Sequence, residues 1–186
     1  MAQHEGFARR RAEELEPLLQ RGIFAGFGAS MMMGFFAMAA SGTYAGRGFF
    51  TPAYHVAFTI DPNTLGLSIQ KAREGEPLFF SHEPFVFGVA AHVMVGAILG
   101  ALFALLAPRL RLRERRALWG GLIYGLAIMV LMSVLILPVV AEMSGAGQPI
   151  SRMGGDIGWP TWVALHAIFG LALGLWLYVR PQDVEG

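Results

Sequence analysis

Four long apolar stretches constrain the fold of this chain more than any other feature. Each has about the 20 residues that an α-helix needs to cross a bilayer, and none contains Asp, Glu, Lys or Arg. The 186-residue chain is 55% hydrophobic and 15% charged, with a mean hydropathy of +0.52, which is typical of membrane proteins. We therefore expect an all-α integral membrane four-helix bundle with spans at about 22–41, 85–107, 117–141 and 161–179.

Basic residues lie unevenly around the four spans. Ten precede the first span, join the second to the third or follow the fourth, whereas four lie in the other two connections. Because cytoplasmic segments are enriched in basic residues, the pattern predicts a multi-pass protein of the bacterial inner (cytoplasmic) membrane with both termini in the cytoplasm. Residues 1–21 would be a cytoplasmic amphipathic helix along the membrane surface, 22–179 the membrane domain and 180–186 a cytoplasmic tail.

A cleavable signal peptide is the alternative interpretation of the first span, because residues 37–39 read Ala-Met-Ala. The apolar stretch is longer than the core of a usual signal peptide, and Glu13, Glu14 and Glu16 precede it. We therefore expect the first span to be retained.

Composition excludes several classes of function. A formal net charge of +1 gives no support for a nucleic-acid partner, and the absence of cysteine excludes disulfides, iron–sulfur clusters and covalent haem. The sequence contains no recognisable nucleophile–base constellation, phosphate-binding loop or paired intramembrane carboxylate. The chain therefore reads as non-enzymatic.

One motif occurs in both the second and the fourth span. The pattern H-x3-G-x3-G places His92 before Gly96 and Gly100, and His166 before Gly170 and Gly174. Residues four apart share one ridge of a helix, and a histidine inside a membrane normally faces a partner, a cavity or a ligand. The two histidines begin about 12 and 9 Å into their spans, at about 1.5 Å per residue, which predicts similar depths.

The first and third spans share a weaker pattern. Gly22 and Gly26 align with Gly121 and Gly125, so the chain reads as two helical hairpins in tandem. Ridges of small residues at four-residue spacing let membrane helices approach closely. Beneath a histidine, a glycine such as Gly96 or Gly170 has two interpretations: helix packing, or room for a flat ligand.

These motifs resemble those of the YagU-like group of small four-helix bacterial inner-membrane proteins. The matching residues are His92, Gly96, Gly100, Tyr124, Gly125, Pro138, His166, Phe169, Gly170 and Gly174. The match covers the second to fourth spans and, loosely, the first; the long connection after the first span departs from the compact members. The resemblance implies a four-span membrane fold and brings no catalytic residue with it.

Three roles remain open for the histidine pair. Each ring could bond a hydroxyl or backbone carbonyl of a neighbouring helix and lock the bundle, with Tyr124, Ser30 and Ser133 as candidate partners. If the second and fourth spans are diagonal, His92 and His166 could instead be the axial ligands of one haem b, beside Gly96 and Gly170. The third role is a small-ligand or transport pocket. A bare metal ion usually needs more protein ligands than two.

The connection between the first two spans is too long for a simple loop. Asp61 and Pro62 predict the start of a short helix that runs to about Glu74 and stops at Gly75. His55, Asp61, His82 and Glu83 in this connection could form a metal site, but their spacing favours exposed polar residues.

Two classes of function remain. The first is a non-enzymatic membrane protein that works in the lipid bilayer as a homo-oligomer or as an accessory subunit of a larger complex. The second is a small b-type cytochrome that passes electrons; a small-solute channel or transporter subunit is a further alternative.

Overall fold

The computed structural model describes the backbone of residues 2–113 and 115–179, and the regular structure in these residues is helical. Four segments are long and apolar enough to cross a membrane: Leu15–Thr43, His82–Arg109, Arg115–Ser144 and Trp159–Trp176. The chain is therefore a multi-pass membrane protein. Its helices, in order, are α1 (Ala2–Thr43), α2 (Thr51–Ala57), α3 (Pro62–Arg73), α4 (His82–Arg109), α5 (Arg115–Leu131), the π-helix η1 (Met132–Ile136), α6 (Leu137–Ser144), α7 (Gln148–Ser151), α8 (Met153–Ile157) and α9 (Trp159–Val179).

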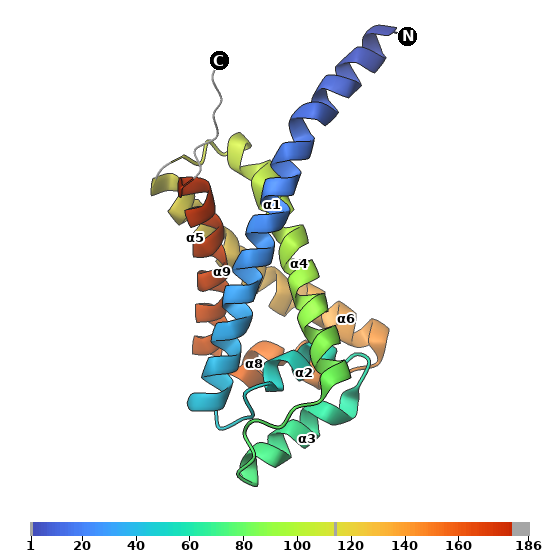
Figure 1. The fold of residues 1–186 in the computed structure, drawn as a ribbon, viewed down its shortest axis with the longest axis vertical. Coiled ribbons are helices and arrows are strands. Elements are labelled where there is room, and N and C mark those ends of the chain that lie inside the picture. The colour runs from blue at the N-terminus through green and yellow to red at the C-terminus, as the bar shows by residue number, and fades with distance from the viewer. Residues whose placement is uncertain (1, 114, 180–186) are drawn as a thin grey trace.

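The long helices α1, α4, α5 and α9 run along the long axis of the molecule (Figure 1). The short helices α2, α3, α7 and α8 gather at one end, which we call the cap end. The connection between α4 and α5 lies at the opposite end, which we call the arginine end. Helix α1 packs against α4 and α9, and α5 packs against α9.

Helix α1 differs from the expectation for the N-terminal segment. It is one uninterrupted helix of 42 residues with Pro17 inside it, and it projects beyond the bundle at the arginine end (Figure 1). The segment before residue 22 therefore continues the helix of the first span. Its Ala, Arg, Glu and Leu residues are strong helix formers, so continuing the helix costs less than breaking it. The predicted tail, 180–186, lies outside the described residues.

The third span is interrupted by the π-helix η1. Pro138, at the start of α6, has no N–H to donate, and its ring clashes with the carbonyl four residues earlier in a regular helix. The helix widens just before it, where the N–H of Leu137 bonds the carbonyl of Met132, five residues back. The Ser133 hydroxyl also donates to the carbonyl of Met129 at 2.8 Å.

One side chain of α5 both bonds and packs against α4. The Tyr124 hydroxyl donates to the carbonyl of Leu99 at 2.8 Å, and its ring lies 5.0 Å from that of Phe103. Phe103 belongs to a buried apolar cluster with Phe169 and Leu173 of α9. Tyr124 therefore contacts neither histidine through its hydroxyl bond, although the sequence made it a candidate partner.

The helix of the first long connection begins at a side-chain cap. The carboxylate of Asp61 accepts hydrogen bonds from the backbone N–H groups of Asn63 and Thr64, and Pro62 is the first helical residue. Helix α3 ends at Arg73, and Gly75 follows with a φ of 93°. Glycine adopts this left-handed conformation without the steric cost of a β-carbon.

Candidate functional site

Glycines bring α1 and α4 into backbone contact. A β-carbon at Gly26 would overlap the carbonyl oxygen of Gly96, and one at Gly22 would lie 2.7 Å from that of Gly100. In the other direction, a β-carbon at Gly96 would overlap the side chain of Ser30. The glycines of each helix are therefore covered by the other helix of the pair.

The pair α5 and α9 uses the same device in a different register. A β-carbon at Gly125 would overlap the carbonyl oxygen of His166, and one at Gly121 would overlap that of Gly170. Gly26 lies against Gly96 and Gly100, whereas its sequence counterpart Gly125 lies against His166 and Gly170. Relative to the alignment of Gly26 with Gly125, the second pair is therefore shifted by one helical turn.

His92 bonds the neighbouring span. Its Nε2 lies 3.0 Å from the carbonyl oxygen of Ser30 on α1. A carbonyl can only accept, so Nε2 carries the proton and donates. The ring also lies against Gly34, where an added β-carbon would be 3.5 Å from Cδ2 and Nε2. The backbone of Ser30, not its hydroxyl, is thus the partner, because the hydroxyl donates to the carbonyl of Phe27.

His166 bonds its own helix. It is 3% exposed, and its Nδ1 donates to the carbonyl of Trp162 at 2.9 Å. Its ring also packs on the Trp162 ring, edge to face, with centroids 4.4 Å apart. The two imidazoles therefore have different partners and different surroundings.

Trp162 takes the place in the second pair that His92 takes in the first. Gly34 lies eight residues after Gly26, and Ser133 lies eight residues after Gly125. His92 packs on Gly34, whereas the Nε1 of Trp162 donates to the Ser133 hydroxyl at 3.0 Å. Sequence analysis missed Trp162, although its position four residues before His166 on one ridge was visible.

A haem between His92 and His166 does not fit these residues. The space beside Gly96 is filled by α1, and the space beside Gly170 is filled by the backbone of Gly121 on α5. His92 also uses its Nε2 on the carbonyl of Ser30, so ligation through that atom would break this bond. The expectation that Gly96 and Gly170 leave room for a porphyrin is therefore wrong: close helix packing uses that room.

His55 joins the two connections at the cap end. It lies on α2, is 2% exposed, and its Nε2 donates to the carbonyl of Pro149 on α7 at 2.6 Å. Burial lowers the pKa of His55, and the nearby charge of Arg47 lowers it further; the Pro149 bond and the charge of Asp156 partly offset this. The expectation that His55 is an exposed polar residue is wrong, because contacts distant in sequence bury it.

Further polar contacts close the cap end. A guanidinium nitrogen of Arg47 donates to the carbonyl of Asp156, and the hydroxyls of Tyr44 and Thr161 bond at 3.2 Å. A cavity of about 20 Å³, room for one water molecule, adjoins Arg47, His55 and Thr161. Across the described ranges, no three His, Cys, Asp or Glu side chains are close enough to hold a metal ion, and His82 and Glu83 are exposed.

Comparison of the chain with protein-family models, curated proteins and solved structures found no match.

Proposed function

We propose that this chain is a non-enzymatic structural protein of the bacterial inner membrane, made of two tandem helical hairpins, in the first of which His92 locks two helices together. The observation that carries the proposal is the bond from the Nε2 of His92 to the carbonyl of Ser30 on the neighbouring span. A hydrogen bond of this kind stabilises the contact between two membrane helices. The resemblance to the YagU-like group, itself a proposal, agrees with a small four-span scaffold.

We place both termini on the cytoplasmic side, because the arginine end carries most of the basic residues. The cap end, where His55 and Arg47 join the two remaining connections, then faces the periplasm. The cap limits how far the helix ends can separate, which is a property that a scaffold needs.

The proposal includes association through the third span, as a homo-oligomer or as an accessory subunit. In its most apolar window 11% of the residues are buried within the chain, against 44% in the fourth span. Its exposed side chains include Trp119, Ile123, Val134 and Met143. This surface contacts lipid in a monomer, and in an assembly it is the span with most surface left to contribute.

The test removes the imidazole of His92 and measures the stability of the protein. We expect His92→Ala to lower the unfolding free energy by about 1–2 kcal/mol, because it loses an interhelical bond and side-chain packing. His82→Ala is the matched control, since His82 is an exposed histidine on the same helix. Thermal unfolding in detergent measures both variants.

A reduced-minus-oxidised absorption spectrum of the wild-type protein, expressed with a haem precursor, tests the cytochrome alternative. A Soret band that disappears in both His92→Ala and His166→Ala would overturn the structural role. Native mass spectrometry from nanodiscs, on the same preparation, measures whether the chain is a homo-oligomer.

A further inference from the structure

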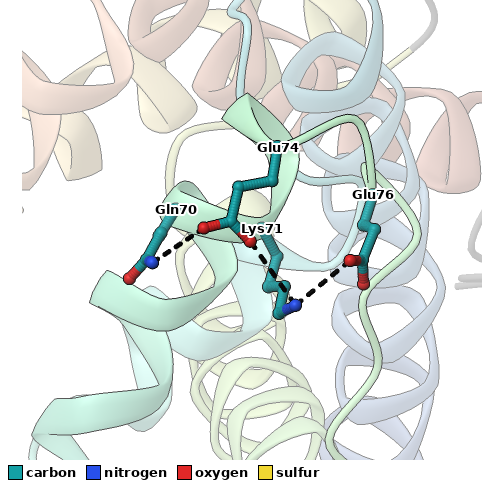
Figure 2. Close-up of polar contacts among 4 residues, drawn as sticks. All are labelled: Gln70, Lys71, Glu74 and Glu76. Carbon is teal, nitrogen blue, oxygen red and sulfur yellow. Dashed lines mark hydrogen bonds and ion pairs between the residues drawn. The ribbon is translucent and has the colours of Figure 1, made fainter.

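One basic residue at the cap end is paired with carboxylates of its own chain. At the cap end, Lys71 lies 3.4 Å from a carboxylate oxygen of Glu74 and 3.1 Å from one of Glu76, and Gln70 bonds Glu74 as well (Figure 2). Lys71 is the only lysine of the sequence. Its charge is neutralised locally by two carboxylates.

The arginine end has exposed basic residues at the boundary between two spans. Arg111, Arg113, Arg115 and Arg116, which we call the arginine connection, are all exposed. Glu114 is the single acidic residue among them, so residues 111–116 carry a formal charge of +3. Ion pairs within the part of the chain that the structure describes involve Lys71 and not these four. Arg109 is separate, because its guanidinium bonds the carbonyl of Leu105 on its own helix.

Leu112 anchors the start of the arginine connection to the bundle. The side chain of Leu112 packs against Gly120, where an added β-carbon would lie 2.6 Å from it, and against the buried cluster around Phe103. The turn is therefore fixed to the bundle at Leu112, and Arg111 and Arg113 flank this anchor. The anchor therefore fixes the position of Arg111 and Arg113 relative to the bundle.

Arg111 has a φ of 51°, which is the left-handed region. Among the described residues other than glycine, it is the one with a positive φ. A β-carbon makes this conformation unfavourable, and glycine or asparagine adopts it at lower cost. Backbone strain of this kind persists only where the surrounding structure imposes it, and such residues cluster at functional sites.

From these observations we propose that the arginine connection binds the phosphate headgroup of an anionic phospholipid. The guanidinium group donates two parallel hydrogen bonds to a phosphate, and all four basic residues here are arginine. Clusters of basic residues directly beside the end of a membrane helix are attracted to anionic lipid. The contact would fix the depth of α4 and α5 in the membrane. It does not depend on the structural role of His92.

The test measures thermal unfolding of the full chain in detergent with added phosphatidylglycerol. We expect phosphatidylglycerol to raise the melting temperature of the wild-type protein, and phosphatidylcholine to raise it less. Arg111→Gly should weaken the apparent lipid affinity about fivefold, which corresponds to one arginine near an anionic surface. Because Arg111→Gly also relieves the left-handed backbone, its melting temperature without lipid should not fall. Lipid binding and folding are thereby separated.

Further variants and a second ligand, inorganic phosphate, complete the experiment. Arg115→Gln combined with Arg116→Gln should weaken the response more than Arg111→Gly, whereas Arg73→Gln, an exposed arginine at the cap end, should leave it unchanged. Inorganic phosphate should not reproduce the shift, because it has no acyl chains in the bilayer. An equal response to phosphatidylcholine or to inorganic phosphate, or a wild-type response in Arg111→Gly and in the double variant, would overturn the proposal.

Discussion

The two helix pairs of this protein solve the same packing problem with different chemistry. In α1 and α4, an imidazole, His92, bonds a carbonyl of the partner helix directly. In α5 and α9, an indole, Trp162, reaches the hydroxyl of Ser133, which in turn donates to the carbonyl of Met129. Counted from the first glycines, Met129 corresponds to Ser30. Both pairs therefore connect an aromatic N–H to a carbonyl at the corresponding position. The connection is direct in the first pair and passes through a hydroxyl in the second.

The difference shows that a glycine ridge alone does not select a register. Glycines at four-residue spacing repeat along the helix, so one helix can slide by a turn and still find small residues opposite it. The two pairs differ in the bulky residue beyond the ridge. His92 fits against Gly34, whereas Trp162 reaches the third span where η1 widens the helix beside Ser133. Relative to the sequence alignment, the contacts of the second pair are thus shifted by one helical turn, although the two motifs are alike.

The largest expected effect comes from filling a ridge. Gly26→Ala should lower the unfolding free energy by about 1–3 kcal/mol, because the added carbon overlaps the carbonyl oxygen of Gly96. Gly125→Ala should do the same, because the added carbon overlaps the carbonyl oxygen of His166. Thermal unfolding in detergent measures both.

The matched control is Gly28→Ala, two residues after Gly26 on α1, where an added carbon meets nothing within 4 Å. It should leave stability nearly unchanged. Equal losses at Gly26 and Gly28 would mean that backbone contact does not hold the first pair together.

A smaller effect is expected where the pairs differ. Trp162→Phe keeps a ring but removes the Nε1 donor, and should cost about 1 kcal/mol. Ser133→Ala removes the acceptor of the same bond. A double-mutant cycle measured by thermal unfolding should therefore give a combined loss smaller than the sum of the two. Additive losses would show that the hydroxyl does not connect Trp162 to the third span.

The smallest expected effect concerns the cap that joins the pairs. Burial lowers the pKa of His55, so the folded protein takes up this proton less readily than the unfolded chain. Above a pH of about 6.5 both states are neutral and the unfolding free energy is level; as the pH falls below it, the unfolded chain gains the proton first and stability declines.

The measurement is the melting temperature between pH 8 and pH 5. His55→Gln removes the titrating group and retains an amide that can donate to the Pro149 carbonyl, so the decline should be shallower. Asp156 and Arg47 remain in both proteins and do not confound the comparison. An identical decline in the variant would assign the pH dependence to other groups.

Much of the membrane fold was visible in the sequence, because hydropathy alone marks helices that must satisfy their backbone bonds internally. All four predicted spans fall on helical segments that meet the criterion for crossing a membrane. Two features of the helices were not predicted. The residues before 22 continue α1, and a π-helix precedes Pro138 inside the third span.

The candidate site was predicted less well. The ridge positions of Gly96 and Gly170 were recognised, but their interpretation as room for a ligand fails, because the partner helices occupy that room. His55 was taken for an exposed residue, since nothing in its neighbourhood predicts the Pro149 carbonyl 94 residues later. Trp162 gave no signal as a partner of Ser133, because the link depends on the one-turn offset of the second pair.

The sequence by itself determined that this chain lies in a membrane as helices with glycine ridges, because burial of apolar length and close backbone approach are local properties of composition and spacing. The tertiary structure decided the register of each pair and thereby the partners of His92, Trp162 and His166. A ridge that repeats every turn is compatible with several registers, and only the contact between whole helices selects one of them.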